Sequence, residues 1–187
     1  MPDLFTFDEE LHEGRFNGIR VKSVTTILQE EGLIDTTWFT EYGRLKGSHT
    51  HKAILLDSEN DLDEATVDEA IRGRLEAFRK FKRETGFKII ESEVRYFNPI
   101  YRFTGKPDVL GLLYGKTAVI DYKPWTLQWW TRYQLAGYEW FYDFPVKRYA
   151  LRLGDNGQYR LTPYEDRTDK HSFLAILTTN RIKEAHK

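Results

Sequence analysis

The residues that most constrain this chain run from 105 to 125, GKPDVLGLLYGKTAVIDYKPW, and predict two β-strands joined by a short turn. Asp108 stands at the start of the first strand, and Asp121 and Lys123 stand near the end of the second. Because side chains alternate along a strand, Asp121 and Lys123 leave one face while their neighbours point to the other. Charged residues therefore enter a hairpin otherwise made largely of Val, Leu and Ile.

These three charged side chains need a physical explanation. If Asp108 pairs near the end of the second strand, two carboxylates and an ammonium converge, and like charges repel at a cost that burial increases. A divalent cation resolves the conflict, since Mg²⁺ accepts one or two carboxylates, acidifies bound water and stabilises charge on a phosphoryl oxygen. Lys123 is a poor ligand and would instead orient the attacking water or stabilise the transition state. The competing interpretation gives Asp108 a turn-shaping role and places Lys123 on a solvated strand end.

Composition restricts the cofactors and the compartment. The chain of 187 residues contains no cysteine, which excludes a disulfide scaffold, an iron–sulfur cluster and a cysteine-ligated zinc site. No apolar run approaches membrane length and MPDLFTFDEE does not resemble a signal peptide, so we expect a cytoplasmic protein without a membrane partner. Residues 1–70 carry 6 Lys/Arg against 16 Asp/Glu, and residues 71–187 carry 22 against 13. Two explanations account for this asymmetry equally well: the basic half binds a polyanion, or the two halves attract each other in the fold.

The order of the predicted elements indicates one domain, residues 1–187, with a helical part at about 23–86 and a sheet with helices at about 88–187. Hairpins are predicted at 15–22 and 146–163 and a strand at 88–97, with Glu91 and Glu93 on one face of that strand. Helices are predicted from Ser23 to Gly32, at 37–56, beyond the acidic loop 57–64, at 127–142 and at 169–184. This order favours an α/β (α+β) fold with a central mixed β-sheet flanked by helices.

Several short motifs carry a resemblance to a known family. Gly105-Lys106-Pro107-Asp108, followed by Asp121-Tyr122-Lys123, resembles the core of the PD-(D/E)XK nucleases, above all the RecB-like branch, lambda-type exonucleases and CRISPR-associated adaptation nucleases. Residues 47–51, GSHTH, are similar to the Gly-x-x-x-His motif of that branch, and residues 134–138, QLAGY, to its Gln-x-x-x-Tyr motif. The surrounding pattern resembles the family from about residue 20 to the C-terminal helix.

The resemblance implies a restriction-endonuclease-like core and assigns roles at the matched positions. The implied metal ligands are His51, Asp108, Asp121 and the backbone carbonyl of Tyr122. The implied catalytic residues are Asp108, Asp121, Lys123 and Glu93. Glu93 matches an upstream strand glutamate that many members carry, and Glu91 is the alternative for that position. The implied cofactor is Mg²⁺ or Mn²⁺, because imidazole ligation suits the softer ion as well.

The chain departs from the family pattern in two ways. Pro124 stands where relatives usually have threonine or serine, so a contact made by that hydroxyl is in doubt. The absence of cysteine removes the iron–sulfur cluster that some relatives contain.

Three further groups of residues have both a structural and a functional interpretation. His49 and His51 lie about 200° apart on a helix, so His49 is expected to be an ordinary packed or edge histidine. Gln134 and Tyr138 share a helical face with the expected core residues Trp130 and Phe141, and a buried amide needs partners in the substrate or the site.

The third group is the segment WTLQWWTR, residues 125–132, which sets tryptophans beside Lys123 and Arg132. Trp125 and Arg132 are predicted to bind substrate, since aromatics beside basic groups stack unpaired bases and hold the backbone. Core packing is the competing interpretation for the tryptophans.

Together these features predict a Mg²⁺- or Mn²⁺-dependent deoxyribonuclease acting on single- or double-stranded DNA. The resemblance implies an exonuclease of DNA repair, recombination or phage DNA processing, the last in the host cytoplasm. The alternative is a nucleic-acid-binding module on the same fold that does not cleave. The sequence leaves the oligomeric state open.

Overall fold

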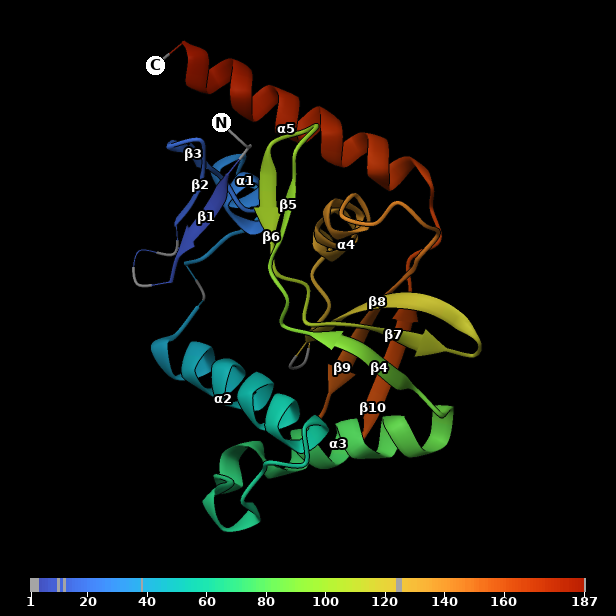
Figure 1. Ribbon diagram of the computed structural model, residues 1–187. Helices are drawn as coiled ribbons and strands as arrows, with labels where there is room; N and C mark the ends of the chain where they lie inside the picture. The colour runs from blue at the N-terminus through green and yellow to red at the C-terminus, as the bar shows by residue number, and fades with distance from the viewer. Residues whose placement is uncertain (1–3, 10, 12, 38, 124–125, 187) are drawn as a thin grey trace.

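A central five-stranded sheet organises the molecule (Figure 1). The computed structural model describes residues 4–9, 11, 13–37, 39–123 and 126–186. Across the sheet the strands are β10 (Tyr159–Pro163), β9 (Lys147–Leu153), β8 (Lys116–Lys123), β7 (Val109–Leu113) and β4 (Lys88–Ser92). β8 and β9 run parallel, and the other neighbours are antiparallel. The predicted mixed sheet is therefore confirmed, as are the hairpins formed by β7 with β8 and by β9 with β10.

Two smaller sheets and five α-helices complete the described part of the chain. The first small sheet contains β1 (Phe5–Asp8), β2 (Glu13–Phe16) and β3 (Ile19–Val21); the second contains β5 (Tyr96–Asn98) and β6 (Phe103–Gly105). The helices are α1 (Val24–Glu30), α2 (Glu41–Ser58), α3 (Glu69–Thr85), α4 (Thr131–Glu139) and α5 (Thr168–Ala185), with a 3₁₀ turn at Glu64–Thr66. None of the helices in the described ranges has the length and apolar character needed to cross a bilayer.

The sheet is covered by helices on both faces, and each face has its own apolar core. Figure 1 shows α2 and α3 on one side of the sheet and α4 and α5 on the other. Ile120 and Tyr122 of β8 belong to the cluster packed on α3, whereas Val119 belongs to the cluster with α4 and α5. Phe78 and Phe81 of α3 are fully buried, and each such side chain contributes about 1.5–3 kcal/mol. The alternation along β8 therefore directs Asp121 and Lys123 towards the α4 side.

Most helix ends follow local capping chemistry. The Ser23 side chain accepts a hydrogen bond from the N–H of Thr26 and begins α1, as predicted. α2 begins at Glu41 rather than at 37, because the Thr40 side chain caps it by accepting from the N–H of Gly43. α4 is also shorter than the predicted 127–142, since no side chain caps its first turn and its end tightens into i→i+3 hydrogen bonds.

The prediction of one strand over residues 88–97 is wrong. β4 ends at Ser92 after a register shift between Ile89 and Glu91, and Glu93 adopts a left-handed conformation with φ of 55°. The chain then leaves the central sheet to form β5. Because the strand ends at Ser92 and Glu93 is left-handed, Glu91 and Glu93 do not share a strand face.

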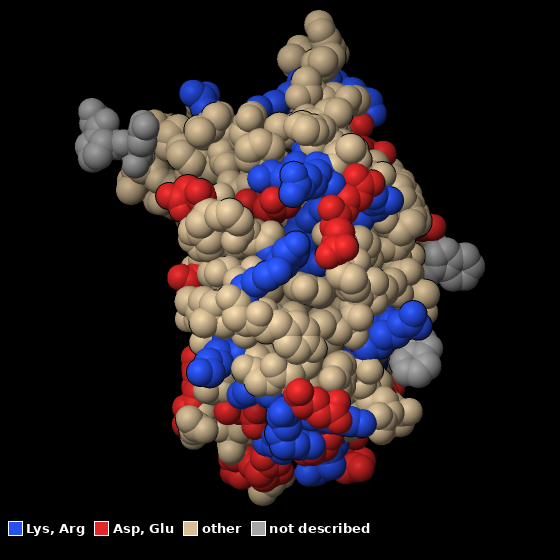
Figure 2. Space-filling model, turned by 90° about the vertical axis from the view of Figure 1, so that its right-hand side faces the viewer, with Lys and Arg blue, Asp and Glu red and all other residues tan. Residues whose placement is uncertain are grey.

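The charge asymmetry along the sequence is partly balanced within the fold. Arg79 pairs with Asp57 and Glu64, and Lys183 pairs with Glu31, so basic residues of the second half meet acidic residues of the first. On the face shown in Figure 2, basic and acidic side chains are interspersed in both the upper and the lower part. This pattern fits the expectation that the two halves attract each other.

Candidate active site

Three of the predicted site residues meet where α2, the end of β4 and the start of β7 come together. His51 Nδ1 lies 3.1 Å from Glu93 Oε1 and 3.4 Å from Asp108 Oδ1. One potential ligand atom from each of His51, Glu93 and Asp108 lies within 4.8 Å of the other two. The left-handed backbone at Glu93 turns this carboxylate towards His51, while Glu91 accepts a hydrogen bond from the Tyr96 hydroxyl instead. Of the two alternative glutamates, the fold brings Glu93 to the histidine.

The hairpin register brings Asp108 and Asp121 to the same end of the sheet. Val109 pairs with Ile120, so the residues one step further along, Asp108 and Asp121, stand opposite each other. Asp108 Oδ2 accepts a hydrogen bond of 2.5 Å from the backbone N–H of Tyr122. Asp121 is 2% exposed and Asp108 8%, so both carboxylates have lost most of their contact with water. Two acidic groups are thus buried side by side where the hairpin predicted them.

Lys123 is held in one position by its neighbours on β8 and α4. Its Nζ lies 2.6 Å from Asp121 Oδ2 and donates a hydrogen bond of 2.9 Å to Gln134 Oε1. Gln134 Nε2 in turn donates to the Tyr138 hydroxyl at 3.0 Å, and both side chains are buried. Lys123 Nζ also lies 5.0 Å from the centroid of the Trp130 ring. The Gln-x-x-x-Tyr motif therefore orients the lysine, and Trp130 packs in the core as expected.

Burial and charge oppose each other at these groups. Burial disfavours the imidazolium of His51, but the charges and hydrogen bonds of Asp108 and Glu93 outweigh it and raise the pKa of His51 to about 10. Burial also disfavours ionised Asp108, yet His51, the Tyr122 N–H and Lys123 keep the pKa of Asp108 below its ordinary value. At Asp121 burial dominates and, with repulsion from Asp108, raises its pKa to about 6 in spite of Lys123. Asp121 is therefore the carboxylate whose charge its surroundings compensate least.

The donor set fits a divalent cation. Asp121 Oδ2 is buried, and although Lys123 Nζ is close, no donor among the described residues makes a hydrogen bond of good geometry to it. Burial beside Asp108 disfavours the ionised form of Asp121 even with this lysine, and a bound cation would relieve that penalty. Two or three carboxylates with one imidazole suit Mg²⁺ or Mn²⁺ better than soft metals.

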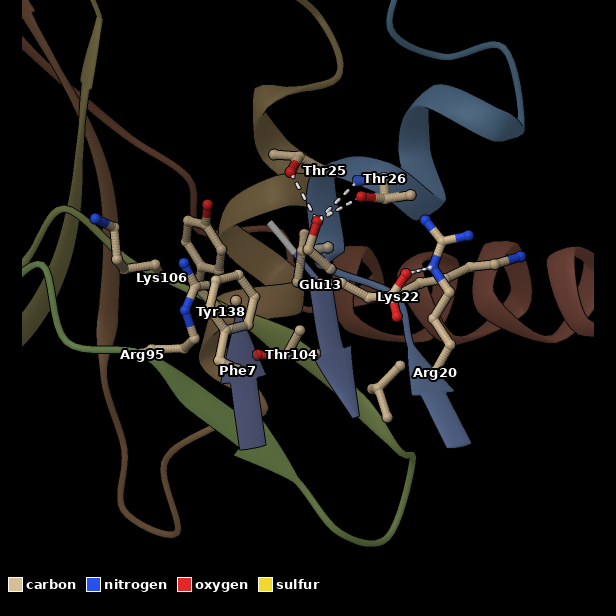
Figure 3. Close-up of a pocket in the computed structure, with 15 residues that line it drawn as sticks. Phe7, Glu13, Arg20, Lys22, Thr25, Thr26, Arg95, Thr104, Lys106 and Tyr138 are labelled. Atoms are coloured by element: carbon tan, nitrogen blue, oxygen red, sulfur yellow. Dashed lines mark hydrogen bonds and ion pairs between the residues drawn. The ribbon is translucent and has the colours of Figure 1, made fainter. Parts of the chain in front are cut away.

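A hollow lined by Lys106 and Tyr138, among others (Figure 3), is connected to the site through the contact of Lys106 with Glu93. It measures about 310 Å³ and lies between the small sheet of β1–β3, α1 and the β5–β6 hairpin. Its basic lining residues are Arg20, Lys22, Arg95 and Lys106, and its hydroxyl-bearing ones are Ser23, Thr25, Thr26, Thr104 and Tyr138. The Arg95 guanidinium stacks 3.2 Å from the centroid of the Phe7 ring, and its buried Nε has no hydrogen-bond acceptor among the described residues.

Sequence reasoning assigned no role to Lys106 and Arg95, two further basic residues near this cluster. Lys106 Nζ lies 2.6 Å from Glu93 Oε2, and Arg95 follows Glu93 closely in the chain. Lys106 belongs to the quoted motif Gly105-Lys106-Pro107-Asp108, so its proximity could have been inferred from that position. Nothing in the local pattern points to Arg95, since the bulge of β4 and the turn at Glu93 decide where it lies.

The other predicted substrate-binding residues lie elsewhere or outside the described residues. Arg132 Nε contacts Asp169 Oδ1 at 2.6 Å, and its Nη2 contacts Asp166 Oδ2 at 2.7 Å, so its guanidinium ties α4 to the start of α5. Trp129 is 62% exposed and edge-on to Tyr133. Trp125 and Pro124 lie outside the described residues. His49 is exposed, consistent with an edge position.

Comparison with known proteins gives similar structures but no family. No family model matches this chain, and no curated protein sequence matches it. A crystal structure of LHK-Exo in complex with dAMP is 16% identical, covers 89% of each chain and gives a TM-score of 0.47. A crystal structure of an alkaline exonuclease (LHK-Exo) from Laribacter hongkongensis is also 16% identical, covers 89% of this chain and 92% of its own, and gives 0.38.

Proposed function

We propose that this protein is a Mg²⁺- or Mn²⁺-dependent deoxyribonuclease that hydrolyses phosphodiester bonds. The observation that carries the proposal is the buried carboxylate pair, Asp108 and Asp121, beside a histidine, a third carboxylate and a lysine that Asp121 holds in place. A protein that only bound nucleic acid would gain nothing from this arrangement, because burying two carboxylates side by side disfavours the fold.

The residues that would hold the ion are His51, Glu93, Asp108, Asp121 and the carbonyl of Tyr122. When bound, a divalent ion supplies a more acidic water and stabilises charge that develops on the phosphoryl oxygens. Lys123 supplies a positive charge at a fixed place, because Asp121 and Gln134 hold its ammonium from two sides. It is suited to orient the attacking water or to stabilise the negative transition state. Water adds to phosphorus, and the leaving oxygen departs with a proton as a hydroxyl.

The hollow beside the site supports action at DNA ends. The terminal group of a DNA strand can occupy a recess beside the site, whereas the middle of a strand must continue past it. The recess offers Arg95, Lys106 and several hydroxyls to a phosphate, and the buried Arg95 Nε lacks an acceptor among the described residues. We therefore propose an exonuclease, with Tyr138 lining the position of the terminal nucleotide.

The experiment that tests the proposal is a cleavage assay on labelled single- and double-stranded DNA with Mg²⁺, Mn²⁺ or EDTA. Asp121→Ala and Lys123→Ala are expected to lower cleavage by about 10³-fold or more while the fold is retained, since each removes charge stabilisation of several kcal/mol. EDTA is expected to abolish cleavage by the unaltered protein. Linear substrates are expected to be degraded and closed circles to persist.

The two neighbouring glutamates provide a matched control. Glu93→Gln is expected to reduce cleavage strongly, whereas Glu91→Gln makes the same chemical change two residues away and is expected to have little effect. Full activity of Asp121→Ala or Lys123→Ala would refute the assignment. DNA binding without any metal-dependent cleavage by the unaltered protein would favour the non-cleaving module.

A further inference from the structure

A row of three cations crosses the sheet from the proposed catalytic lysine to the sheet edge. In the strand register, Lys123 of β8 pairs with Arg152 of β9, and Arg152 pairs with Arg160 of β10. Residues paired across neighbouring strands project from the same face of a sheet. Lys123, Arg152 and Arg160 therefore form one line on the face that carries Asp121, and the three strands lie side by side in Figure 1.

The row ends in an exposed cation beside a hollow. Like charges placed opposite each other on neighbouring strands disfavour a sheet unless other groups compensate them, and Asp121 compensates Lys123 at 2.6 Å. Arg160 is exposed and Arg152 is half-buried, and both line a hollow of about 250 Å³ with Asn156 and Gln158. Arg160 is therefore the member of the row best placed to reach the phosphate of a ligand.

We propose that Arg152 and Arg160 bind the phosphates of a polynucleotide strand as it extends from the active site. This inference rests on the proposed function, because the row begins at Lys123. With about 4.8 Å between neighbouring strands, the row reaches about 10 Å beyond Lys123. That distance corresponds to about three nucleotides at a rise of 3.4 Å per nucleotide of one strand. The ligand is the phosphodiester backbone, which the row binds without regard to base sequence.

The test measures binding in EDTA, where cleavage cannot contribute, by fluorescence anisotropy of a labelled single strand of about 12 nucleotides. Arg160→Glu is expected to weaken binding by about tenfold or more, the loss typical of one charge-assisted contact. The slope of log affinity against log salt is expected to fall by about 0.7 for the lost phosphate contact. Arg160→Lys is expected to retain most of the affinity. A trinucleotide is expected to bind Arg160→Glu as tightly as it binds the unaltered protein.

The matched control is Lys88→Glu, which makes an equal charge change on β4 at the opposite edge of the same sheet. It is expected to leave both affinity and salt slope close to those of the unaltered protein. Unchanged affinity in Arg160→Glu, an equal loss in Lys88→Glu, or no binding of the strand by the unaltered protein would overturn the inference. Equal competition by polyglutamate would assign the row to an acidic peptide and would also overturn it. Binding is measured in EDTA and does not depend on cleavage. Failure of the nuclease proposal and failure of the phosphate-binding proposal can therefore be told apart.

Discussion

Two clusters of buried charge have members on the α4 side of the sheet, and they are built in different ways. In the first, Asp169 receives Arg132 on one carboxylate oxygen at 2.6 Å and Arg148 on the other at 3.2 Å. Arg148 also contacts Glu139 at 3.2 Å and donates to the carbonyl of Asp166 at 2.6 Å. In this cluster Arg132, Arg148 and Asp169 each face an opposite charge, and its members join α4, β9 and α5.

The second cluster, at the candidate active site, is left open. Lys123 lies 2.6 Å from Asp121 Oδ2, yet burial and the charge of Asp108 still raise the pKa of Asp121 to about 6. The comparison teaches that burial of charge alone does not identify a functional site. A closed network stabilises the fold, whereas an open one stores a penalty that a ligand can relieve.

The largest effect that sharpens this contrast is expected from Asp169→Ala. The substitution removes one of the two carboxylates, Asp169 and Glu139, that contact the buried guanidinium of Arg148, and should lower the free energy of unfolding by about 3 kcal/mol. Asp121→Ala should cost less, because the folded state already disfavours the ionised form of Asp121. Denaturant unfolding of both variants, with exposed Asp143→Ala as the control, measures the difference. A greater loss in Asp121→Ala than in Asp169→Ala would reverse the comparison.

A smaller effect is expected from adding metal. If the open cluster takes a divalent ion, Mn²⁺ at 100 times its Kd should raise the free energy of unfolding by about 2.7 kcal/mol. Asp108→Asn should remove this stabilisation, whereas Glu91→Gln should keep it. Thermal unfolding with and without Mn²⁺ provides the measurement and does not depend on activity. Equal stabilisation of Asp108→Asn and the unaltered protein would show that the ion binds elsewhere.

The sequence predicted the parts of the site that depend on strand periodicity and motif order. The hairpin of β7 and β8 sets Asp108 against Asp121, as its alternation required, and the helix of residues 41–58 carries His51 to them. The position of Glu93 could not be derived, because a bulge in β4 and one left-handed residue decide it.

Arg132 illustrates a second limit of sequence reasoning. A basic residue beside tryptophans predicts substrate contact, but the partners that engage its guanidinium, Asp166 and Asp169, lie more than thirty residues further along the chain. Contacts at such separation depend on the packing of α4 against α5, which no local pattern encodes. Its role in substrate binding remains a prediction.

The smallest expected effect is a pH dependence that belongs to the open cluster alone. Burial disfavours protonated His51, but Asp108 and Glu93 raise its pKa in the folded, metal-free protein to about 10, against about 6.5 when unfolded. The stabilisation is therefore fully present below pH 6.5 and is lost as the pH rises through about 10. Because the ring is partly exposed and coupled to two carboxylates, we expect a loss on the order of 1–2 kcal/mol.

The test measures the free energy of unfolding in EDTA between pH 6 and pH 10.5 for the unaltered protein and for His51→Gln. Both contain the same tyrosines, so the difference between the two free energies reports the imidazole alone. The difference should shrink across that window, and His49→Gln, an equal change on the exposed side of α2, should behave like the unaltered protein. A constant difference would mean that His51 does not carry the compensating proton. The cluster at the candidate active site would then differ from the cluster around Asp169 in the arrangement of its side chains and not in their protonation.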